Sequence, residues 1–183
     1  MKIITPQSNN EHLIEQASQL LMDAFREHWP NAWPTLEEAL QEVNKLFGEG
    51  KICYAAIDEN ENLLGIIGGM LHYDGHVWEL HPLAVQPSMQ GQGIGRALVK
   101  ELEEQVRQRG GLTITLGSDD EDGMTSLSHI DLHKNPWEQI KNIRNIKGHP
   151  FGFYQKMGFT ITGVVPDANG RGKPDILMSK KVG

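Results

Sequence analysis

Apolar residues near the N-terminus recur every three or four positions, after a short strand that we expect over residues 2–5. From Leu13 to Ala24 this spacing predicts an amphipathic helix over residues 11–28. Trp29 and Pro30 follow directly and are expected to end it. The first element of any length is therefore a surface helix with one apolar face.

A second helix is predicted by its start signal. Thr35 and Glu38 have the spacing of a capping box, in which the hydroxyl and the carboxylate each accept a hydrogen bond from a free backbone N–H. Apolar residues at helical spacing continue to Phe47, and Gly48 follows. The pattern predicts a helix that begins at Leu36.

The next part of the chain has the composition of strands. Apolar, partly β-branched runs cover residues 52–57 and 63–71, and the polar residues 58–62 between them are typical of a hairpin turn. Residues 77–85 are predicted to form another strand. Three consecutive strands joined by short turns indicate an antiparallel sheet.

A glycine-rich segment at residues 90–96 leads into a helix that Gly110 and Gly111 close. A buried strand over residues 112–116 comes next. Strand, glycine loop, helix and strand together predict a βαβ unit with parallel strands and a right-handed crossover.

The C-terminal part is polar at first and then regular again. The predicted elements are a short helix around residues 137–146, a helix over 150–157 that Gly158 stops, and two strands over 159–165 and 176–180. No repeat or linker interrupts the chain, so we expect one domain over residues 1–183.

Composition narrows the function classes. Among 183 residues, 38% are hydrophobic and 22% charged, which is typical of a globular protein. Seventeen Lys and Arg against twenty-four Asp and Glu give a net charge of −7, which argues against a nucleic-acid partner and permits a cationic one. No run is apolar enough for a membrane span, and the N-terminus does not resemble a signal peptide, so we expect a cytoplasmic protein with no membrane partner.

Cysteine and histidine usage argues against metal or disulfide chemistry. The single Cys53 lies in an apolar stretch, where a buried, inert thiol is expected. The eight histidines have no paired ligand spacing, so we predict no metal site.

The glycine loop is suited to an anion, because glycines let the backbone approach it and the helix N-terminus offers free N–H groups. A Walker loop needs Lys followed by Ser or Thr, whereas Arg96 follows Gly95 here. The even spacing of Gly91, Gly93 and Gly95 also differs from a dinucleotide fingerprint. The alternative is a turn in which the glycines serve geometry alone.

The pattern Gln90-x-x-Gly93-x-Gly95, between a strand and an amphipathic helix, resembles the acetyl-coenzyme A pyrophosphate loop of the GNAT acetyltransferases. The resemblance implies an α/β (α+β) fold with a mixed, mostly antiparallel sheet, one parallel βαβ crossover and helices on both faces. It implies a bulge in the strand near Leu83 to Val85 and a late helix with a tyrosine, to which Phe153–Phe159 is similar. The implied residues for acetyl-coenzyme A are Leu83, Ala84, Val85, Gln90, Gly91, Gln92, Gly93, Ile94, Gly95 and Arg96.

Further blocks resemble one branch of this superfamily, the single-domain aminoglycoside 6'-N-acetyltransferases. The blocks are Trp78–Leu83, Leu116–Asp120, His149-Pro150, Pro166–Gly170 and Lys173–Ile176. The resemblance places Glu79 as the base or amine-orienting residue, His81 beside it, and Tyr154 at the departing thiolate. It places Trp29, Tyr73, Glu79, Asp119, Asp120 and Asp122 around the aminoglycoside, with Trp33 as the alternative to Trp29. Gln90 stands where many relatives have Arg, and a homodimer is implied.

The chemistry of these residue types fits amine acetylation. Glu79 can take a proton from the amine, and Tyr154 can donate one to the sulfur. The acidic run from Asp119 to Asp122, together with the net charge of −7, suits a polycation. Each residue also has a structural alternative: a solvated strand carboxylate, a packed aromatic ring and a solvated loop. His81 is more often structural beside Pro82, and we expect it to support the site by a hydrogen bond.

The function that this resemblance implies is acetyl transfer from acetyl-coenzyme A to the 6'-amine of an aminoglycoside, by direct attack in a ternary complex. Cys53 lies apart from the motifs, and no residue offers a covalent nucleophile. Two alternatives stay open: the same chemistry on polyamine or protein amines, and a non-enzymatic sensor that binds acyl-coenzyme A.

Overall fold

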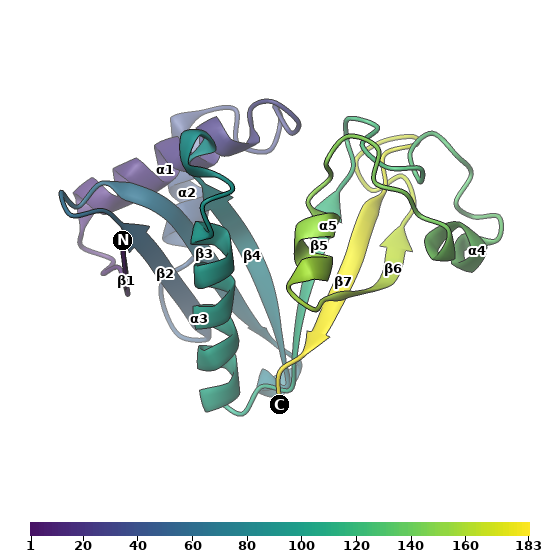
Figure 1. Cartoon of the computed structure of the whole chain (residues 1–183). Helices are drawn as coiled ribbons and strands as arrows, with labels where there is room; N and C mark the ends of the chain where they lie inside the picture. The colour runs from purple at the N-terminus through teal and green to yellow at the C-terminus, as the bar shows by residue number, and fades with distance from the viewer. The chain divides into compact units, whose positions relative to one another are not determined.

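A computed structural model describes residues 1–183. The chain forms two compact units, residues 1–114 with 182–183, and residues 115–181. The helices and strands of the first unit, shown in Figure 1, are β1 (Lys2–Ile4), α1 (Glu11–Phe25), α2 (Leu36–Asn44), β2 (Lys51–Ile57), β3 (Leu63–His72), β4 (Val77–Val85) and α3 (Ile94–Gln108). Short 3₁₀ turns at Tyr73–Gly75 and Pro87–Met89 flank β4.

Four antiparallel strands, β1 to β4, form the sheet of this unit in sequence order. The next strand, β5 (Thr113–Asp119), begins beside the start of β4, because the N–H groups of Leu112 and Thr113 both donate to the carbonyl of His76. Two strands whose starts coincide run parallel, with α3 as the crossover between them. The whole strand order is β1-β2-β3-β4-β5-β7-β6, which confirms the predicted mixed sheet.

Helices cover both faces of the first unit's sheet. Buried side chains of α1 and α2, Leu20 and Val43 among them, pack against Cys53 of β2 and Ile66 of β3 in one apolar cluster. On the other face α3 lies close to β3, where a Cβ on Gly69 would meet Leu102 of α3 at 2.7 Å. Helices on both faces confirm the predicted layers.

A bulge interrupts the pairing of β3 with β4. Ile67 pairs with Leu83 and Gly69 with Leu80, so the single residue Gly68 lies opposite both His81 and Pro82. The extra residue in β4 reverses the face of the sheet on which each later β4 side chain lies. A Cβ on Gly68 would lie 2.3 Å from the His81 carbonyl oxygen, so the bulge requires glycine there. The predicted bulge is present, just before Leu83.

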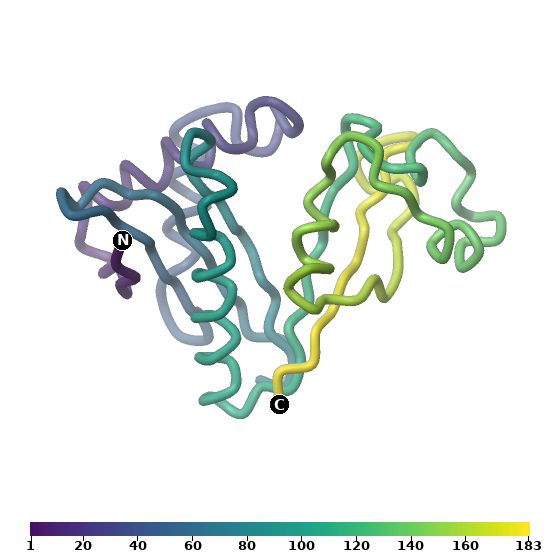
Figure 2. Tube along the Cα trace, in the orientation of Figure 1, coloured from purple at the N-terminus to yellow at the C-terminus, as the bar shows by residue number.

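The second unit contains the end of β5, α4 (Pro136–Lys141), α5 (Phe151–Lys156), β6 (Thr160–Val165) and β7 (Asp175–Lys181). β6 and β7 pair antiparallel as a hairpin. The last residues of the chain return to the first unit, where the N–H of Val182 donates to the Leu112 carbonyl at 2.9 Å, as the tube in Figure 2 lets the reader follow.

Several predicted boundaries differ from the observed ones. α1 ends at Phe25 rather than His28, although the N–H of Trp29 still donates to the Phe25 carbonyl in a turn. α2 ends at Asn44, because the N–H of Leu46 bonds back only three residues to Val43 and the turn tightens. The helix predicted around residues 137–146 is α4, which spans only Pro136–Lys141.

Cys53 is 6% exposed within the α1–α2 cluster, and burial raises the pKa of its thiol to about 12. The predicted burial of the thiol is confirmed, and a thiol with a raised pKa is a weak nucleophile at neutral pH. None of the helices is both long and apolar enough to cross a membrane.

Candidate active site

The glycine loop before α3 leaves backbone donors free. Gly93 is the N-cap of α3 with φ +88°, and no side chain caps the helix. The first N–H groups of any helix have no partner inside it. Gly91 also has positive φ, and a Cβ at Gly91 or Gly93 would meet no atom within 4 Å, so the loop surface is open. An anion can therefore approach the backbone closely.

Charge at this helix terminus also favours an anion. Arg96 is exposed in the first turn of α3, which contains no acidic residue. A helix N-terminus is the positive end of the helix dipole, so the helix itself does not stabilise the Arg96 cation there. The dipole and Arg96 both attract an anion. The residues present thus fit the diphosphate of acetyl-coenzyme A. The Gln90 amide donates to the Val85 carbonyl at 3.4 Å, a neutral contact within the loop.

The β4 residues expected to bind the pantetheine arm are part of the core and of the β3–β4 pairing. Ala84 is 2% exposed and packs in the α1–α2 cluster, so its side chain belongs to the core. Leu83 and Val85 pair with Ile67 and Gly65 of β3. Their role toward the thioester stays a prediction.

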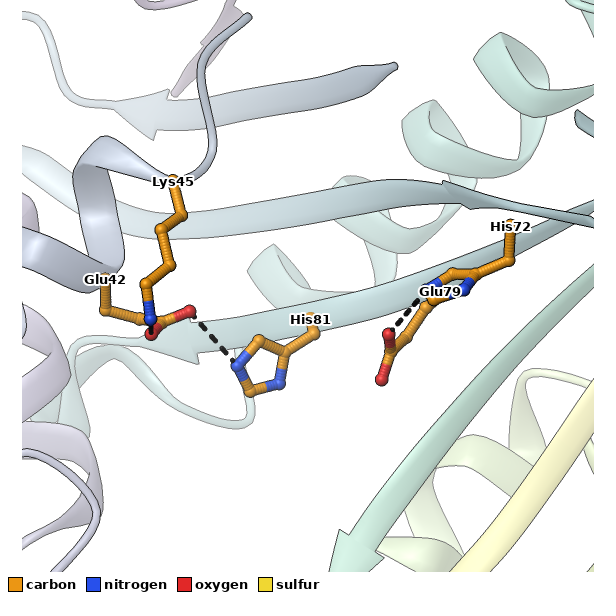
Figure 3. Close-up of polar contacts among 5 residues, drawn as sticks. All are labelled: Glu42, Lys45, His72, Glu79 and His81. Atoms are coloured by element: carbon orange, nitrogen blue, oxygen red, sulfur yellow. Dashed lines mark hydrogen bonds and ion pairs between the residues drawn. The ribbon is translucent and has the colours of Figure 1, made fainter. Parts of the chain in front are cut away.

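Glu79 lies on β4 with its carboxylate held by a histidine. Its Oε2 is 2.9 Å from Nε2 of His72, the last residue of β3 (Figure 3). The two side chains are 35% and 47% exposed, so the carboxylate remains accessible. Glu79 is predictable from the sequence but His72 is not, since nothing in the local pattern joins two residues seven positions apart.

His81 lies two residues further along β4 and has a carboxylate partner of its own. Its Nε2 is 3.4 Å from Oε1 of Glu42 on α2, and Lys45 contacts the other oxygen at 2.9 Å (Figure 3). The hydrogen bond with His81 is the main cause that lowers the pKa of Glu42 to about 2, against the effect of burial. Glu42 is thus a carboxylate near neutral pH and an acceptor for His81. The role of His81 toward the substrate stays a prediction.

Of the two candidate tryptophans, Trp33 is the one beside this part of β4. Its ring centroid lies 6.0 Å from that of His81 and 4.7 Å from that of Phe25. Trp29 contacts Phe25 and His28 instead. We therefore favour Trp33 over Trp29 as a substrate-lining residue. Tyr73, the other predicted aromatic contact, is 78% exposed in the turn before β4.

The acidic run of the second unit contains two kinds of carboxylate. Asp120 is 0% exposed, and its oxygens accept hydrogen bonds from the N–H groups of Met124 and Thr125 and from the Ser128 hydroxyl. Burial alone would raise the pKa of Asp120, but these hydrogen bonds outweigh it and hold the pKa below its usual value. The Asp120 carboxylate is thus enclosed and orders the loop, which does not favour the predicted direct contact with the substrate.

Asp119 and Asp122 remain candidates for direct contact. Asp119 ends β5, accepts a hydrogen bond from the Asn169 amide and is half-buried; Asp122 is exposed. The carbonyl of Asp122 accepts from Lys147 Nζ at 2.9 Å, which ties this loop to the segment before α5. Their role toward the substrate stays a prediction.

A buried histidine joins the end of β5 to the start of α5. His149 Nδ1 accepts from the N–H of Phe151 at 3.2 Å, so Nε2 carries the proton and donates to the Asp119 carbonyl at 3.0 Å. His149 is 1% exposed. His149-Pro150 is one of the blocks that carry the resemblance, and these two contacts explain why a histidine stands there.

Tyr154 lies on α5 between the rings of Phe153 and Phe159, at centroid distances of 5.2 and 5.6 Å. The residue is 8% exposed, and burial raises the pKa of its phenol above the usual value. The hydroxyl therefore keeps its proton and is a donor throughout the neutral range. No cluster of three or more His, Cys, Asp or Glu suits a metal ion.

Comparison with known proteins matches this geometry to a family. Residues 14–127 match the acetyltransferase (GNAT) family. Three solved structures are similar over 100% of this chain and 97% of their own. An aminoglycoside 6'-N-acetyltransferase complexed with coenzyme A has 40% identity and a TM-score of 0.90. The aminoglycoside 6'-N-acetyltransferase from Enterococcus faecium has 40% and 0.87, and aminoglycoside 6'-acetyltransferase type Ii has 35% and 0.73. Among curated proteins, none matches the chain.

The family match covers more than half of the chain, and the glycine loop, bulged β4 and α3 all lie within it. The chain belongs to the GNAT family of acetyltransferases.

Proposed function

We propose that this protein transfers the acetyl group of acetyl-coenzyme A to the 6'-amine of an aminoglycoside, by direct attack in a ternary complex. The observation that carries the proposal is the full-length similarity, at 35 to 40% identity, to three aminoglycoside 6'-acetyltransferases. The net charge of −7 supports a polycationic substrate.

Each residue has a defined task in this proposal. Bound acetyl-coenzyme A supplies the activated acetyl thioester. The free N–H groups at Gly93 and Ile94, together with Arg96, hold the diphosphate. Glu79 accepts the proton of the substrate ammonium or orients it, and Tyr154 donates a hydrogen bond to the departing sulfur. Backbone N–H groups near Leu83 stabilise the charge that develops on the carbonyl oxygen.

The test of this function is a screen of amines by release of free thiol from acetyl-coenzyme A. We expect aminoglycosides to give the highest kcat/KM, above polyamines and above peptides with a free N-terminus. A higher kcat/KM on a polyamine or peptide would assign the activity to those amines instead. Absence of thiol release with every amine would favour a sensor. The resemblance also implies a homodimer, which sedimentation equilibrium measures directly.

Gly93→Val should remove most of the stabilisation by acetyl-coenzyme A. At a hundredfold excess over Kd, the ligand stabilises the folded state by about 2.7 kcal/mol, or roughly 5–10 °C in Tm for a chain of this length. A branched side chain at positive φ distorts the loop and covers its open surface. Differential scanning fluorimetry with and without acetyl-coenzyme A measures the shift.

Gly110→Val is the matched control, since Gly110 also has positive φ, at +78°, with nothing within 4 Å of its Cβ position, but lies at the other end of α3. Both variants should lose intrinsic stability. Only Gly93→Val should lose the ligand shift, and an equal ligand shift in the two would remove the glycine loop from the site.

Tyr154→Phe should lower kcat about tenfold with little change in acetyl-coenzyme A affinity. The hydroxyl acts when charge develops on sulfur, and a thiol ionises near pH 8.5, so the thiolate leaves fairly readily without help. Steady-state kinetics with ligand titration separates the two quantities. Tyr54→Phe on β2 is the control and should leave kcat unchanged, whereas wild-type kcat in Tyr154→Phe would leave Tyr154 as a packing residue.

A further inference from the structure

The contact between His72 and Glu79 follows from the register of two strands. His72 pairs with Val77 and Met70 with Glu79, so His72 and Glu79 are diagonal neighbours on one face of the β3–β4 pair. Long side chains span this diagonal, and here Nε2 and Oε2 approach to 2.9 Å (Figure 3). The contact depends on the register that the Tyr73–Gly75 turn sets between the two strands.

The contact between His72 and Glu79 contributes little to the stability of the fold. The side chains of His72 and Glu79 are 47% and 35% exposed, and ion pairs in contact with water contribute little to folding. The contact does restrict the Glu79 carboxylate, which would otherwise rotate about three side-chain bonds. It occupies Oε2 and leaves Oε1 without a hydrogen bond to β3 or β4.

We propose that His72 is a positioning residue for acetyl transfer: it holds Oε2 of Glu79 so that Oε1 meets the substrate amine in one orientation. The inference rests on the proposed function, in which Glu79 receives or orients that amine. His72 itself touches neither the amine nor acetyl-coenzyme A in this arrangement. Its contribution is orientation, and a misplaced catalytic group loses rate even when the fold is unchanged.

The first test is His72→Ala assayed with an aminoglycoside. We expect kcat to fall about 10- to 100-fold, the range that loss of orientation produces, with Tm and acetyl-coenzyme A affinity close to wild type. His72→Gln should recover part of kcat, because its side-chain amide can donate to the same oxygen. The control is His76→Ala, since His76 is an exposed histidine in the same β3–β4 connection whose side chain makes no hydrogen bond or ion pair. Its kcat should equal wild type.

The second test is a double-mutant cycle with Glu79→Gln. If His72 acts through Glu79, His72→Ala should lower kcat much less in the Glu79→Gln background than in wild type. An equal loss in both backgrounds, no recovery with His72→Gln, or an equal loss in His76→Ala would overturn the inference. A wild-type kcat in His72→Ala would overturn this inference alone. Absence of turnover by the wild-type protein with every amine would overturn the proposed function as well.

Discussion

Asp120→Ala should destabilise the protein by about 3–5 kcal/mol, because three buried donors lose one enclosed, charged acceptor. The donors are the N–H groups of Met124 and Thr125 and the Ser128 hydroxyl, and the Asp120 carboxylate is 0% exposed. For a chain of this size the expected loss is roughly 10 °C in Tm. Thermal and urea unfolding measure it. Asp131→Ala in the same unit is the control: that carboxylate is exposed and pairs with Lys134, so the variant should stay close to wild-type Tm.

The same carboxylate predicts a pH dependence of stability. The pKa of Asp120 is lower in the folded protein than in the unfolded chain, where it is about 3.9. Its stabilising contribution is therefore complete above about pH 4 and is lost as the pH falls through the folded-state value. In Asp120→Asn the free energy of unfolding should fall less steeply in this acid range. A wild-type Tm in Asp120→Ala would refute the assigned loop-ordering role.

Glu79→Gln should lower kcat by about 10²- to 10⁴-fold near neutral pH, the range for loss of a general base. The amide keeps the shape of the side chain but cannot take a proton. The loss should shrink as the pH rises, because a growing fraction of the substrate amine is then already neutral. A pH profile of kcat and KM for wild type and variant is the measurement.

Glu15→Gln is the control, since Glu15 is an exposed glutamate on α1 that belongs to none of the candidate sites. It should have wild-type kinetics at every pH. If Glu79→Gln instead raises KM by the same factor at all pH values with kcat unchanged, Glu79 orients the ammonium without taking its proton.

The elements of the fold were predictable because their signals are local. The capping box at Thr35 and Glu38 is present as predicted, with both of its hydrogen bonds formed. Apolar, partly β-branched runs identified β2 and β3, β4 was predicted over its observed range, and the bulge expected near Leu83 to Val85 lies just before Leu83. The helix ends were less accurate, because the chain after Phe25 and Asn44 stays in turns whose hydrogen bonds resemble those of the helix.

The partners of the candidate residues could not be predicted, since they come from distant positions. Glu42 and His81 are far apart in the sequence. They come into contact because α2 packs on the face of the sheet from which the His81 side chain projects. The burial of Asp120 could not be predicted for a related reason: four consecutive acids are typical of a solvated loop. Only the folded loop shows that the second of them is enclosed by N–H groups.

The central claim is that acetyl transfer occurs at the 6'-amine of an aminoglycoside. Two aminoglycosides that differ only in an amine or a hydroxyl at the 6' position test it directly, with the product of each located by two-dimensional NMR. For the amine we predict one acetyl group, on the 6' nitrogen. For the hydroxyl compound we predict a kcat/KM lower by at least about 10²-fold, since the site would lack the ammonium group that Glu79 is proposed to receive. Equal rates on both compounds, or acetylation at another nitrogen, would contradict the account.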